Sequence, residues 1–522
     1  MFTSRRVVSR LTRPTRQAKL GANHVRPFST RAPRIRFHDG RSNRTANAHK
    51  EKLSDIALSE RELHPFPWQL ERMQRLQNET KGRRHREKDY AVPLMTLRDM
   101  CTCPRCVDQS TRQKLFSTVE IPPDISLRNV TELPNGVEIQ WSNDLPGFDE
   151  SHKSVFPKEI FDAMAARGSS KTLPSLPARR LWTDSQFRKE VPDLTYEAYM
   201  EDDTILYKAL QQLHSHGLLF LKDVPESAES VSRIVQRIGP LKNTFYGETW
   251  DVRSVPEAKN VAYTSQDLGF HMDLMYMEQP PHLQFLHCIR SSAVGGASLF
   301  TDSFKAVSEL FHTDEDAFCD LEMRLITFHY DHIDSHYYQQ SRPLIELAPL
   351  RFGTSTFPNY KGFRIFATRK ATDPYLLEMF KLEDYLEAVS WAPPFQAPFQ
   401  SANSHLTGSA QNLTTEIEHH VRFWYPAARK FNDIIHKEEN IHERMMKPGE
   451  CVLFDNRRVL HARKAFEVAD AGKERWLRGA YLDKDPFMSK LRVLANRFEK
   501  EQRKVDSQPV GEDHQEAAAQ AA

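Results

Sequence analysis

Residues 449 to 466 read GECVLFDNRRVLHARKAF, in which two apolar stretches flank an Asp-Asn pair. The pattern predicts a strand, a turn and a returning strand that carries His461 on its inward face. Further short apolar stretches occur at residues 217–224, 282–289, 297–304 and 475–483. Many short strands with a few flanking helices favour an antiparallel barrel or sandwich over a doubly wound parallel sheet.

Two segments of the same region have the apolar spacing that is typical of helices. They read ILYKALQQLHSHG at 205–217, with Gly217 as the expected C-cap, and AESVSRIVQRIG at 228–239. We therefore expect an α+β, mainly β domain with flanking helices over residues 180–486.

A second, smaller β-rich segment precedes this domain. VEIQW at 137–141 alternates apolar and polar residues after the turn signal Pro134-Asn135-Gly136, which predicts a hairpin. The connection GSSKTLPSLPAR at 168–179 has the composition of a linker between domains.

Three of the six cysteines lie in this smaller segment, as Cys101, Cys103 and Cys106. Thiolates at this spacing suit Zn²⁺, and His152 is the best candidate for the fourth ligand of a tetrahedral site. A closed site has no open position for water, so we interpret it as structural. Unligated thiols and a redox-active trio are the alternatives.

A His-x-Asp pair on a strand projects an imidazole and a carboxylate to the same face, and one distal His completes a facial triad for non-haem Fe(II). His312 and Asp314 lie in HTDEDAF, which looks like the first turn of a helix. The sequence HYDHID at 329–334 is harder to dismiss. The pairs with this spacing are His271/Asp273, His312/Asp314, His329/Asp331 and His332/Asp334.

The surroundings favour the pair at 271 and 273. FHMDLMY is followed by an apolar strand, by the turn Gly295-Gly296 and by Ser298. Arg475 lies fourteen residues after His461, and a guanidinium can hold the far carboxylate of a 2-oxo acid whose other end chelates iron.

The net charge of +2 is unevenly distributed. Residues 1–37 contain nine Arg and one Lys with no acidic residue, which is typical of a mitochondrial transit peptide; a disordered basic arm is the alternative. The rest of the chain is acidic overall, so nucleic acid is not an expected partner. The sequence has no apolar run long enough for a membrane span, and six cysteines are too few for a disulfide scaffold.

From about Leu97 to Asp485 the sequence resembles the Fe(II)/2-oxoglutarate dioxygenases, specifically the γ-butyrobetaine dioxygenase group. The resemblance implies a double-stranded β-helix (jelly-roll) catalytic domain preceded by a small zinc-binding domain. It implies His271, Asp273 and His461 as iron ligands, Arg475 and Ser298 as 2-oxoglutarate contacts, and Cys101, Cys103, Cys106 and His152 as zinc ligands. Leu274 departs from the family pattern, in which a Tyr follows the Asp.

Aromatic residues in FYGETW, NVAY and RGAY match the trimethylammonium cage of that family; ordinary core packing is the alternative for each of them. By the same similarity Asn260 contacts the substrate carboxylate. The cage residues would be Tyr246, Trp250, Tyr263 and Tyr481.

The resemblance implies hydroxylation of γ-butyrobetaine to L-carnitine in carnitine biosynthesis, with O₂ consumed, succinate and CO₂ released, and ascorbate as the reductant. Trimethyllysine dioxygenase and another dioxygenase acting on a small molecule are the alternatives within this class. A non-catalytic protein that binds zinc and a quaternary ammonium is the alternative outside it. A homodimer is one expected assembly.

We therefore divide the chain into five parts and place the mature protein in the mitochondrial matrix. The parts are a transit peptide at 1–37, a linker at 38–88, a zinc-binding domain at 89–166, a dioxygenase domain at 180–486 and a helical or disordered tail at 487–522.

Overall fold

The computed structural model describes most of the chain after residue 92. The predicted transit peptide and linker lie outside the described residues, as do Asn260 and Tyr263. Among the helices that the structure does describe, none has the length and apolar character that crossing a membrane requires. The described residues are 93–158, 160, 176–253, 266–292, 294–352, 355–357, 359–362, 382–399, 415, 417–467 and 475–506.

The cysteine-rich segment folds around a three-stranded antiparallel sheet in the order β1-β2-β3. The predicted hairpin is present, because Leu133 at the end of β1 pairs with Gly136 at the start of β2. A small core of Ile139, Trp141 and Phe156 covers one face of the sheet. The elements are α2 (Leu94–Asp99), a 3₁₀ turn (Thr118–Glu120), β1 (Ser126–Leu133), β2 (Gly136–Ser142) and β3 (Lys153–Pro157).

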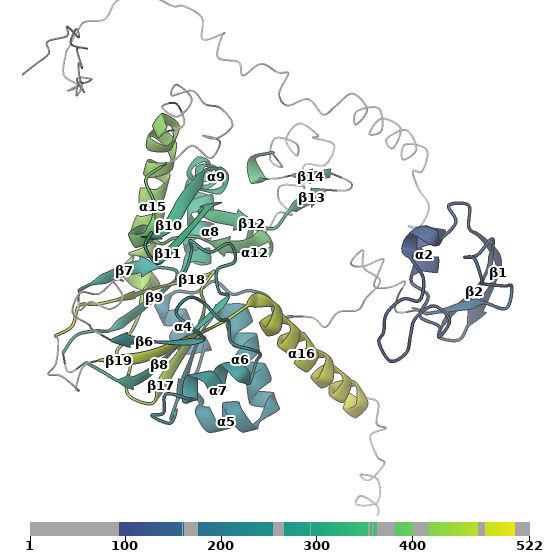
Figure 1. Ribbon diagram of the computed structural model, residues 1–522, viewed down its shortest axis with the longest axis horizontal. Helices are drawn as coiled ribbons and strands as arrows, with labels where there is room; N and C mark the ends of the chain where they lie inside the picture. Colours follow the sequence, from purple (N-terminus) through teal and green to yellow (C-terminus); the bar gives the residue numbers. More distant parts are fainter. Residues whose placement is uncertain are drawn as a thin grey trace, which may run out of the picture. The chain divides into compact units, whose positions relative to one another are not determined.

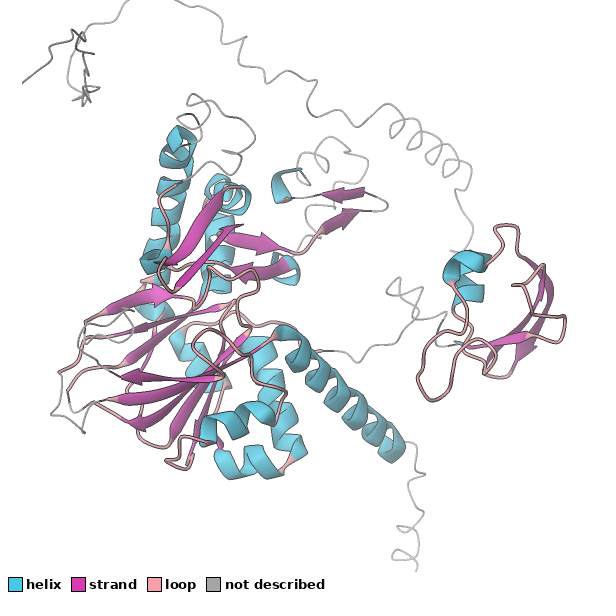
Figure 2. Cartoon of the chain, viewed as in Figure 1, coloured by secondary structure: helices cyan, strands magenta, loops and turns pink. Residues whose placement is uncertain are grey.

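The larger domain is built on two sheets (Figures 1 and 2). The first has six strands in the order β4-β5-β17-β8-β19-β6, and the second has four in the order β16-β9-β18-β7. Neighbouring strands are antiparallel except β4 and β5, which are parallel. The strands are β4 (Leu194–Thr195), β5 (Leu218–Lys222), β6 (Thr249–Arg253), β7 (Leu268–His271), β8 (Leu283–Arg290), β9 (Ser298–Asp302), β16 (His442–Arg444), β17 (Glu450–Asp455), β18 (Val459–Arg463) and β19 (Trp476–Leu482).

The opening sequence motif forms the hairpin β17–β18, but its two strands belong to different sheets. β17 pairs with β5 and β8, whereas β18 pairs with β7 and β9. The Asp-Asn turn is therefore the point where the chain passes from one sheet to the other.

Helices pack against both sheets, so the expected mixture of helices and sheets is confirmed (Figure 1). α6 and α7 contact strands of the six-stranded sheet, and α8, α9 and α15 contact one another. The helices are α4 (Asp184–Glu190), α5 (Tyr196–Glu201), α6 (Asp203–His216), α7 (Ser230–Gln236), α8 (Ser303–Thr313), α9 (Glu315–Met323), α12 (Leu382–Tyr385), α15 (Tyr425–Ile435) and α16 (Lys484–Asp506).

Three two-stranded sheets lie between α9 and α15 in the sequence. Among them, β10 and β11 form a long hairpin that contains the HYDHID motif. The pairs are β10 (Leu325–His332) with β11 (His336–Pro343), β12 (Ile345–Leu347) with β15 (Leu386–Val389), and β13 (Leu350–Phe352) with β14 (Ser355–Phe357).

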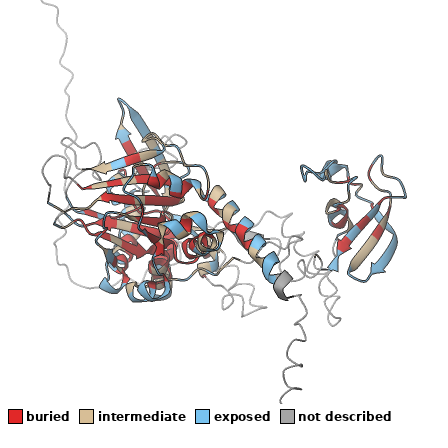
Figure 3. Ribbon diagram, turned by 90° about the horizontal axis from the view of Figure 1, so that it is seen from below, coloured by how far each residue is buried: buried red, intermediate tan, exposed pale blue. Residues whose placement is uncertain are grey.

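Capping residues explain where the predicted helices begin and end. Asp202 accepts a hydrogen bond from the backbone of Thr204 at the start of α6, and Gly217 ends that helix with a φ of 77°. Asp314 caps α9 by accepting from Ala317, so the acidic part of HTDEDAF begins a helix as expected, whereas His312 and Thr313 are the end of α8. Buried residues concentrate on the sheets and on the helix faces turned to them (Figure 3).

Candidate metal centres and the pocket between the sheets

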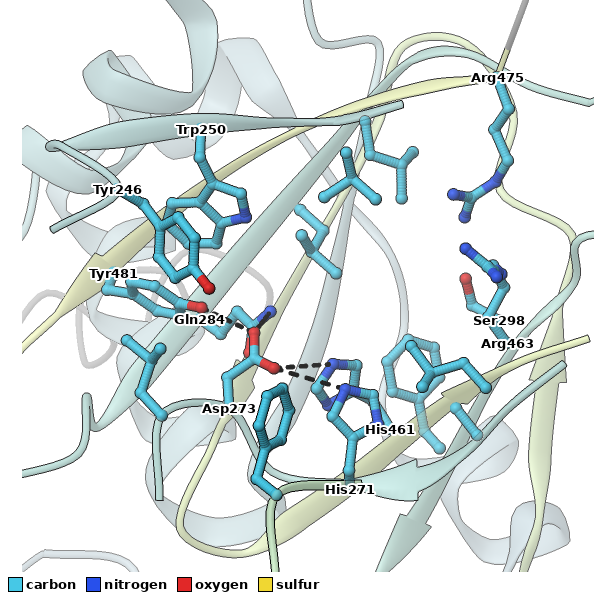
Figure 4. Close-up of a pocket in the computed structure, with 18 of the residues that line it drawn as sticks. Tyr246, Trp250, His271, Asp273, Gln284, Ser298, His461, Arg463, Arg475 and Tyr481 are labelled. Atoms are coloured by element: carbon cyan, nitrogen blue, oxygen red, sulfur yellow. Dashed lines mark hydrogen bonds and ion pairs between the residues drawn. The ribbon is translucent and has the colours of Figure 1, made fainter. Parts of the chain in front are cut away.

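A pocket lies between the two large sheets, because strands of both contribute to its walls (Figure 4). At one end are two imidazoles and a carboxylate, at another two guanidinium groups, and aromatic rings form a third side. The lining residues that carry this chemistry are Tyr246, Trp250, His271, Asp273, Tyr276, Gln284, Ser298, His461, Arg463, Arg475 and Tyr481.

His271, Asp273 and His461 come together in this pocket, with one ligand atom of each within 4.8 Å of the others. The Asp273 Oδ1 atom lies 3.4 Å from Nε2 of His271 and 4.0 Å from Nε2 of His461. The two histidines face each other because β7 and β18 pair in a register that places them opposite. Two imidazoles and a carboxylate in a pocket fit the donor set of a non-haem Fe(II) site.

A hydrogen bond orients one of the two imidazoles, and burial keeps the other neutral. Nδ1 of His271 lies 2.9 Å from the carbonyl of Gly269, to which it donates as the protonated nitrogen, leaving Nε2 free to bind a metal. Burial, and then the charge of His271, lower the pKa of His461 to about 3, so this ring is neutral at pH 7.

The third donor, Asp273, is ionised. Burial raises the pKa of its carboxyl, but the hydrogen bond with His271 and the charge that the two histidines carry when protonated lower it by more, so the pKa lies well below its usual range. Gln284 and Tyr481 donate hydrogen bonds of 2.8 and 2.7 Å to Oδ2 of this carboxylate.

A turn after β7 directs the Asp273 side chain into the pocket. Leu274 has a φ of 60°, a left-handed conformation that few non-glycine residues adopt. Asn456 stabilises this turn from both sides, because its Oδ1 accepts from the backbone N–H of Asp273 and its Nδ2 donates to the carbonyl of Asp273. Asn456 belongs to the Asp-Asn turn, so that turn also positions the carboxylate.

Arg475 extends into the other end of the pocket, with its side chain 6% exposed. Burial, and then the charge of Arg463, lower its pKa to about 10, so it remains a cation at neutral pH. Among the described residues, no carboxylate pairs with it. A buried cation without an internal partner fits a site for an anionic ligand, as the sequence predicted for 2-oxoglutarate.

Ser298 lines the same end of the pocket as Arg463 and Arg475 (Figure 4), and the turn before it explains its position. Gly295 and Gly296 have φ values of 73° and 81°, and Gly296 donates to the carbonyl of Ala465. A Cβ on Gly295 would lie 2.3 Å from that carbonyl oxygen. The Gly-Gly turn therefore allows β9 to begin against the segment that leads to Arg475.

Of the four predicted cage residues, Tyr246, Trp250 and Tyr481 line the pocket, while Tyr263 lies outside the described residues. The rings of Trp250 and Tyr481 stack with their centroids 3.9 Å apart. Trp250 also lies over Gly479, where a Cβ would be 2.4 Å from the indole. The tryptophan is thus part of an aromatic wall in which it packs against Tyr481 and Gly479.

The second metal cluster consists of Cys101, Cys103, Cys106 and His152. The three sulfur atoms lie 3.6, 3.5 and 3.3 Å from Nε2 of His152. Tetrahedral Zn²⁺ with ordinary bond lengths places a sulfur and a nitrogen ligand roughly 3.6 Å apart. The cluster could therefore bind zinc without rearrangement.

Charged residues around this cluster orient its histidine. Nδ1 of His152 lies 2.7 Å from Asp144, which also forms an ion pair with the fully buried Arg98. Arg98 donates to the sulfur of Cys106. A histidine ligand whose second nitrogen binds a carboxylate is the usual arrangement at protein zinc sites.

Replacing Cys103 with Ser is expected to lower the zinc content and destabilise the N-terminal domain, because its apolar core is small and a structural zinc ion contributes directly to folding. Metal analysis by mass spectrometry and thermal unfolding would measure both effects. Cys319→Ser, a buried cysteine in α9, is the matched control and should keep its zinc. Full zinc content in Cys103→Ser would remove Cys103 from the ligand set.

The other His-x-Asp motifs do not form metal clusters among the described residues. His312 lies in the last turn of α8, where Nδ1 bonds the carbonyl of Ser308. His329 and His332 lie on the β10–β11 hairpin, and the ring of His332 contacts Tyr330. All of these motifs have the same spacing, so only their surroundings in the sequence distinguished them from the pair His271 and Asp273.

Gln284 and Tyr276 line the pocket but were not selected from the sequence, and neither was Asn456, which stabilises the turn at Asp273. Gln284 is a polar residue between Leu283 and Phe285 in the mainly apolar strand HLQFLHCI, and this was the available signal. A second guanidinium, that of Arg463, lines the same pocket as Arg475. Arg478 instead pairs with Asp251 and Thr249 outside the pocket.

Two family profiles match the chain. The one described as taurine catabolism dioxygenase TauD, TfdA family covers residues 178–481, and the one described as gamma-butyrobetaine hydroxylase-like, N-terminal covers residues 84–157.

Similar curated proteins cover most of the chain. Dioxygenase str8 of Strobilurus tenacellus is 34% identical, over 78% of this chain and 86% of that protein. Gamma-butyrobetaine dioxygenase of Homo sapiens is 27% identical, over 79% of this chain and 93% of that protein. Mitochondrial trimethyllysine dioxygenase of Rattus norvegicus is 23% identical, over 78% of this chain and 85% of that protein.

Proposed function

The chain belongs to the taurine catabolism dioxygenase TauD, TfdA family, and from this premise we propose that it hydroxylates γ-butyrobetaine at C3 to form L-carnitine. The broader expectation is confirmed: the protein is an enzyme, a 2-oxoglutarate-dependent dioxygenase that uses iron. We also propose that the two large sheets are the halves of a double-stranded β-helix, with the pocket between them as the active site.

His271, Asp273 and His461 would hold the iron, since they are the clustered donors in the pocket. Arg475 and Ser298 would hold the far carboxylate of 2-oxoglutarate. When bound, iron and 2-oxoglutarate supply the oxidising chemistry, in which O₂ is consumed and 2-oxoglutarate is converted to succinate and CO₂. The chain itself orients the reactants and shields them between two sheets.

The observation that carries the choice of substrate is the aromatic wall beside Asp273. Tyr246, Trp250 and Tyr481 line the same pocket as the candidate iron ligands. A trimethylammonium group has no N–H to donate, so aromatic faces and a nearby negative charge are what can attract it. The N-terminal family match and the human relative support γ-butyrobetaine within this class.

Trimethyllysine is the second candidate, because relatives named for that substrate match the chain over a similar length. It shares the trimethylammonium group but adds an α-amino group. The greater identity to dioxygenase str8 keeps another small molecule as the third candidate.

We expect γ-butyrobetaine to bind more tightly than its dimethylamine analogue or trimethyllysine, measured by calorimetry with an inert metal and 2-oxoglutarate present. Replacing Trp250 with Leu should weaken γ-butyrobetaine binding by about 1–2 kcal/mol, roughly 5- to 30-fold, because the variant keeps apolar bulk but loses a π face. Binding of 2-oxoglutarate is the internal control and should not change.

Product analysis by mass spectrometry with Fe(II) and 2-oxoglutarate would then identify the substrate that is hydroxylated. Equal affinity for the trimethylated and dimethylated compounds, or a preference for trimethyllysine, would rule out γ-butyrobetaine. The family assignment does not depend on that result.

A further inference from the structure

We infer that Gln284 and Tyr481 are positioning residues that restrict Asp273 to one ligand oxygen and so keep a coordination position of the iron open for O₂. The inference rests on the proposed iron site but not on the identity of the organic substrate. Neither residue is itself a metal ligand.

The two oxygens of Asp273 have different surroundings. Oδ1 faces Nε2 of His271 and of His461. Oδ2 is turned away from them and accepts two hydrogen bonds, from Nε2 of Gln284 and from the hydroxyl of Tyr481 (Figure 4). Two short bonds to one oxygen hold the carboxylate in a single orientation.

The placement of Gln284 is hard to explain by packing alone. Gln284 is 2% exposed, and the residues on either side of it in β8 are apolar. Its Oε1 atom is buried without a hydrogen-bond partner among the described residues. A buried amide with one unsatisfied atom destabilises the fold. The hydrogen bond to Asp273 is thus the main interaction of the amide, as expected of a residue that serves the site.

The second donor to Oδ2, the hydroxyl of Tyr481, is also on a buried and packed side chain. Tyr481 is 2% exposed, and its ring stacks on Trp250. Because β19 pairs with β8 in a register that puts Tyr481 opposite Gln284, the two donors approach Oδ2 from neighbouring strands. The position of both donors is therefore set by the six-stranded sheet, whereas Asp273 follows a strand of the other sheet.

Whether Asp273 binds the iron through one oxygen or two matters because the metal has a limited number of coordination positions. Three protein ligands leave three positions on an octahedral metal, and a chelating 2-oxo acid takes two of them. Carboxylates bind metals through one or both oxygens. If Oδ2 were released it could take the remaining position, and O₂ would have to compete with it.

The test uses the zinc-loaded full chain and Mn²⁺ as a hard metal probe that does not favour the cysteine site. Mn²⁺ binding is measured by electron paramagnetic resonance for wild type, Gln284→Leu and Tyr481→Phe. Arg478→Met is the matched control, since Arg478 lies on the same strand as Tyr481 but pairs with Asp251 and Thr249 outside the pocket. We expect the first two variants to bind Mn²⁺ about 10-fold or more weakly, and the control to bind as wild type does.

A second measurement separates positioning from general loss of structure. Succinate formation without added substrate gives the KM for O₂ and for 2-oxoglutarate. In Gln284→Leu and Tyr481→Phe the KM for O₂ should rise several-fold, while the KM for 2-oxoglutarate changes much less. Tyr481→Phe keeps the stacked ring, so it reports the hydroxyl alone.

The outcomes distinguish the inference from the proposal beneath it. Unchanged Mn²⁺ binding in His271→Ala would overturn the iron site. If His271→Ala loses Mn²⁺ while Gln284→Leu and Tyr481→Phe bind it as wild type does, or if their KM for O₂ does not rise relative to that for 2-oxoglutarate, the positioning role is wrong.

Discussion

Replacing His271 with Ala is expected to reduce succinate formation to the level of the metal-free enzyme and to leave the zinc content at the cysteine cluster unchanged. His271 supplies one of three clustered donors, and its Nε2 lies 3.4 Å from the Asp273 carboxylate. Both groups would bind the same metal ion. Two remaining ligands hold Fe(II) weakly, since each open position is then filled by water. The cysteine cluster uses none of these residues, so it should be unaffected.

Turnover and metal content measured on the same preparations would check this expectation. Cys103→Ser is the reciprocal variant, which should lose zinc first. If His271→Ala lost zinc and kept its activity, the roles of the two clusters would be reversed.

Replacing Arg475 with Met is expected to weaken 2-oxoglutarate binding by about 2–5 kcal/mol, roughly 30- to several-thousand-fold. The buried carboxylate of the ligand would lose its bidentate partner, and water cannot replace that partner because the side chain is only 6% exposed. Turnover should fall with it. Calorimetry with an inert metal measures the binding without requiring catalysis.

Arg478→Met is the matched control, because this guanidinium is on β19, which begins directly after Arg475, but pairs with Asp251 outside the pocket. It should bind 2-oxoglutarate as the wild type does. Unchanged binding in Arg475→Met would instead assign the clamp to Arg463, which lines the same pocket.

Local patterns in the sequence predicted the parts of this site that depend on neighbouring residues. The His-x-Asp spacing predicted that His271 and Asp273 converge, although a turn after β7, rather than the two-residue repeat of a strand, directs Asp273 to that point. The close spacing of three cysteines indicated one metal cluster. Helix ends at Gly217 and Asp314 followed from the backbone preferences of glycine and the capping ability of aspartate. These signals are readable because the atoms involved are only a few bonds apart.

Strand parity could also have separated the two arginines in advance. Leu477 and Tyr481 line the pocket, an even number of residues apart, whereas Arg478 lies at an odd position and points to the opposite face. Guanidinium chemistry and the family resemblance both selected Arg475 in the sequence, and the structure supplies the physical reason for rejecting Arg478.

The sequence by itself determined the chemistry that the chain carries: two sets of metal donors, a cation for a carboxylate, and a series of short strands with flanking helices. Only the tertiary structure decided how these groups meet. His461 faces His271 because β7 and β18 pair in one register, and Gln284 reaches Asp273 because two sheets face each other across the pocket. Pairing between strands far apart in the sequence depends on the packing of the whole core, for which a single strand carries no local signal.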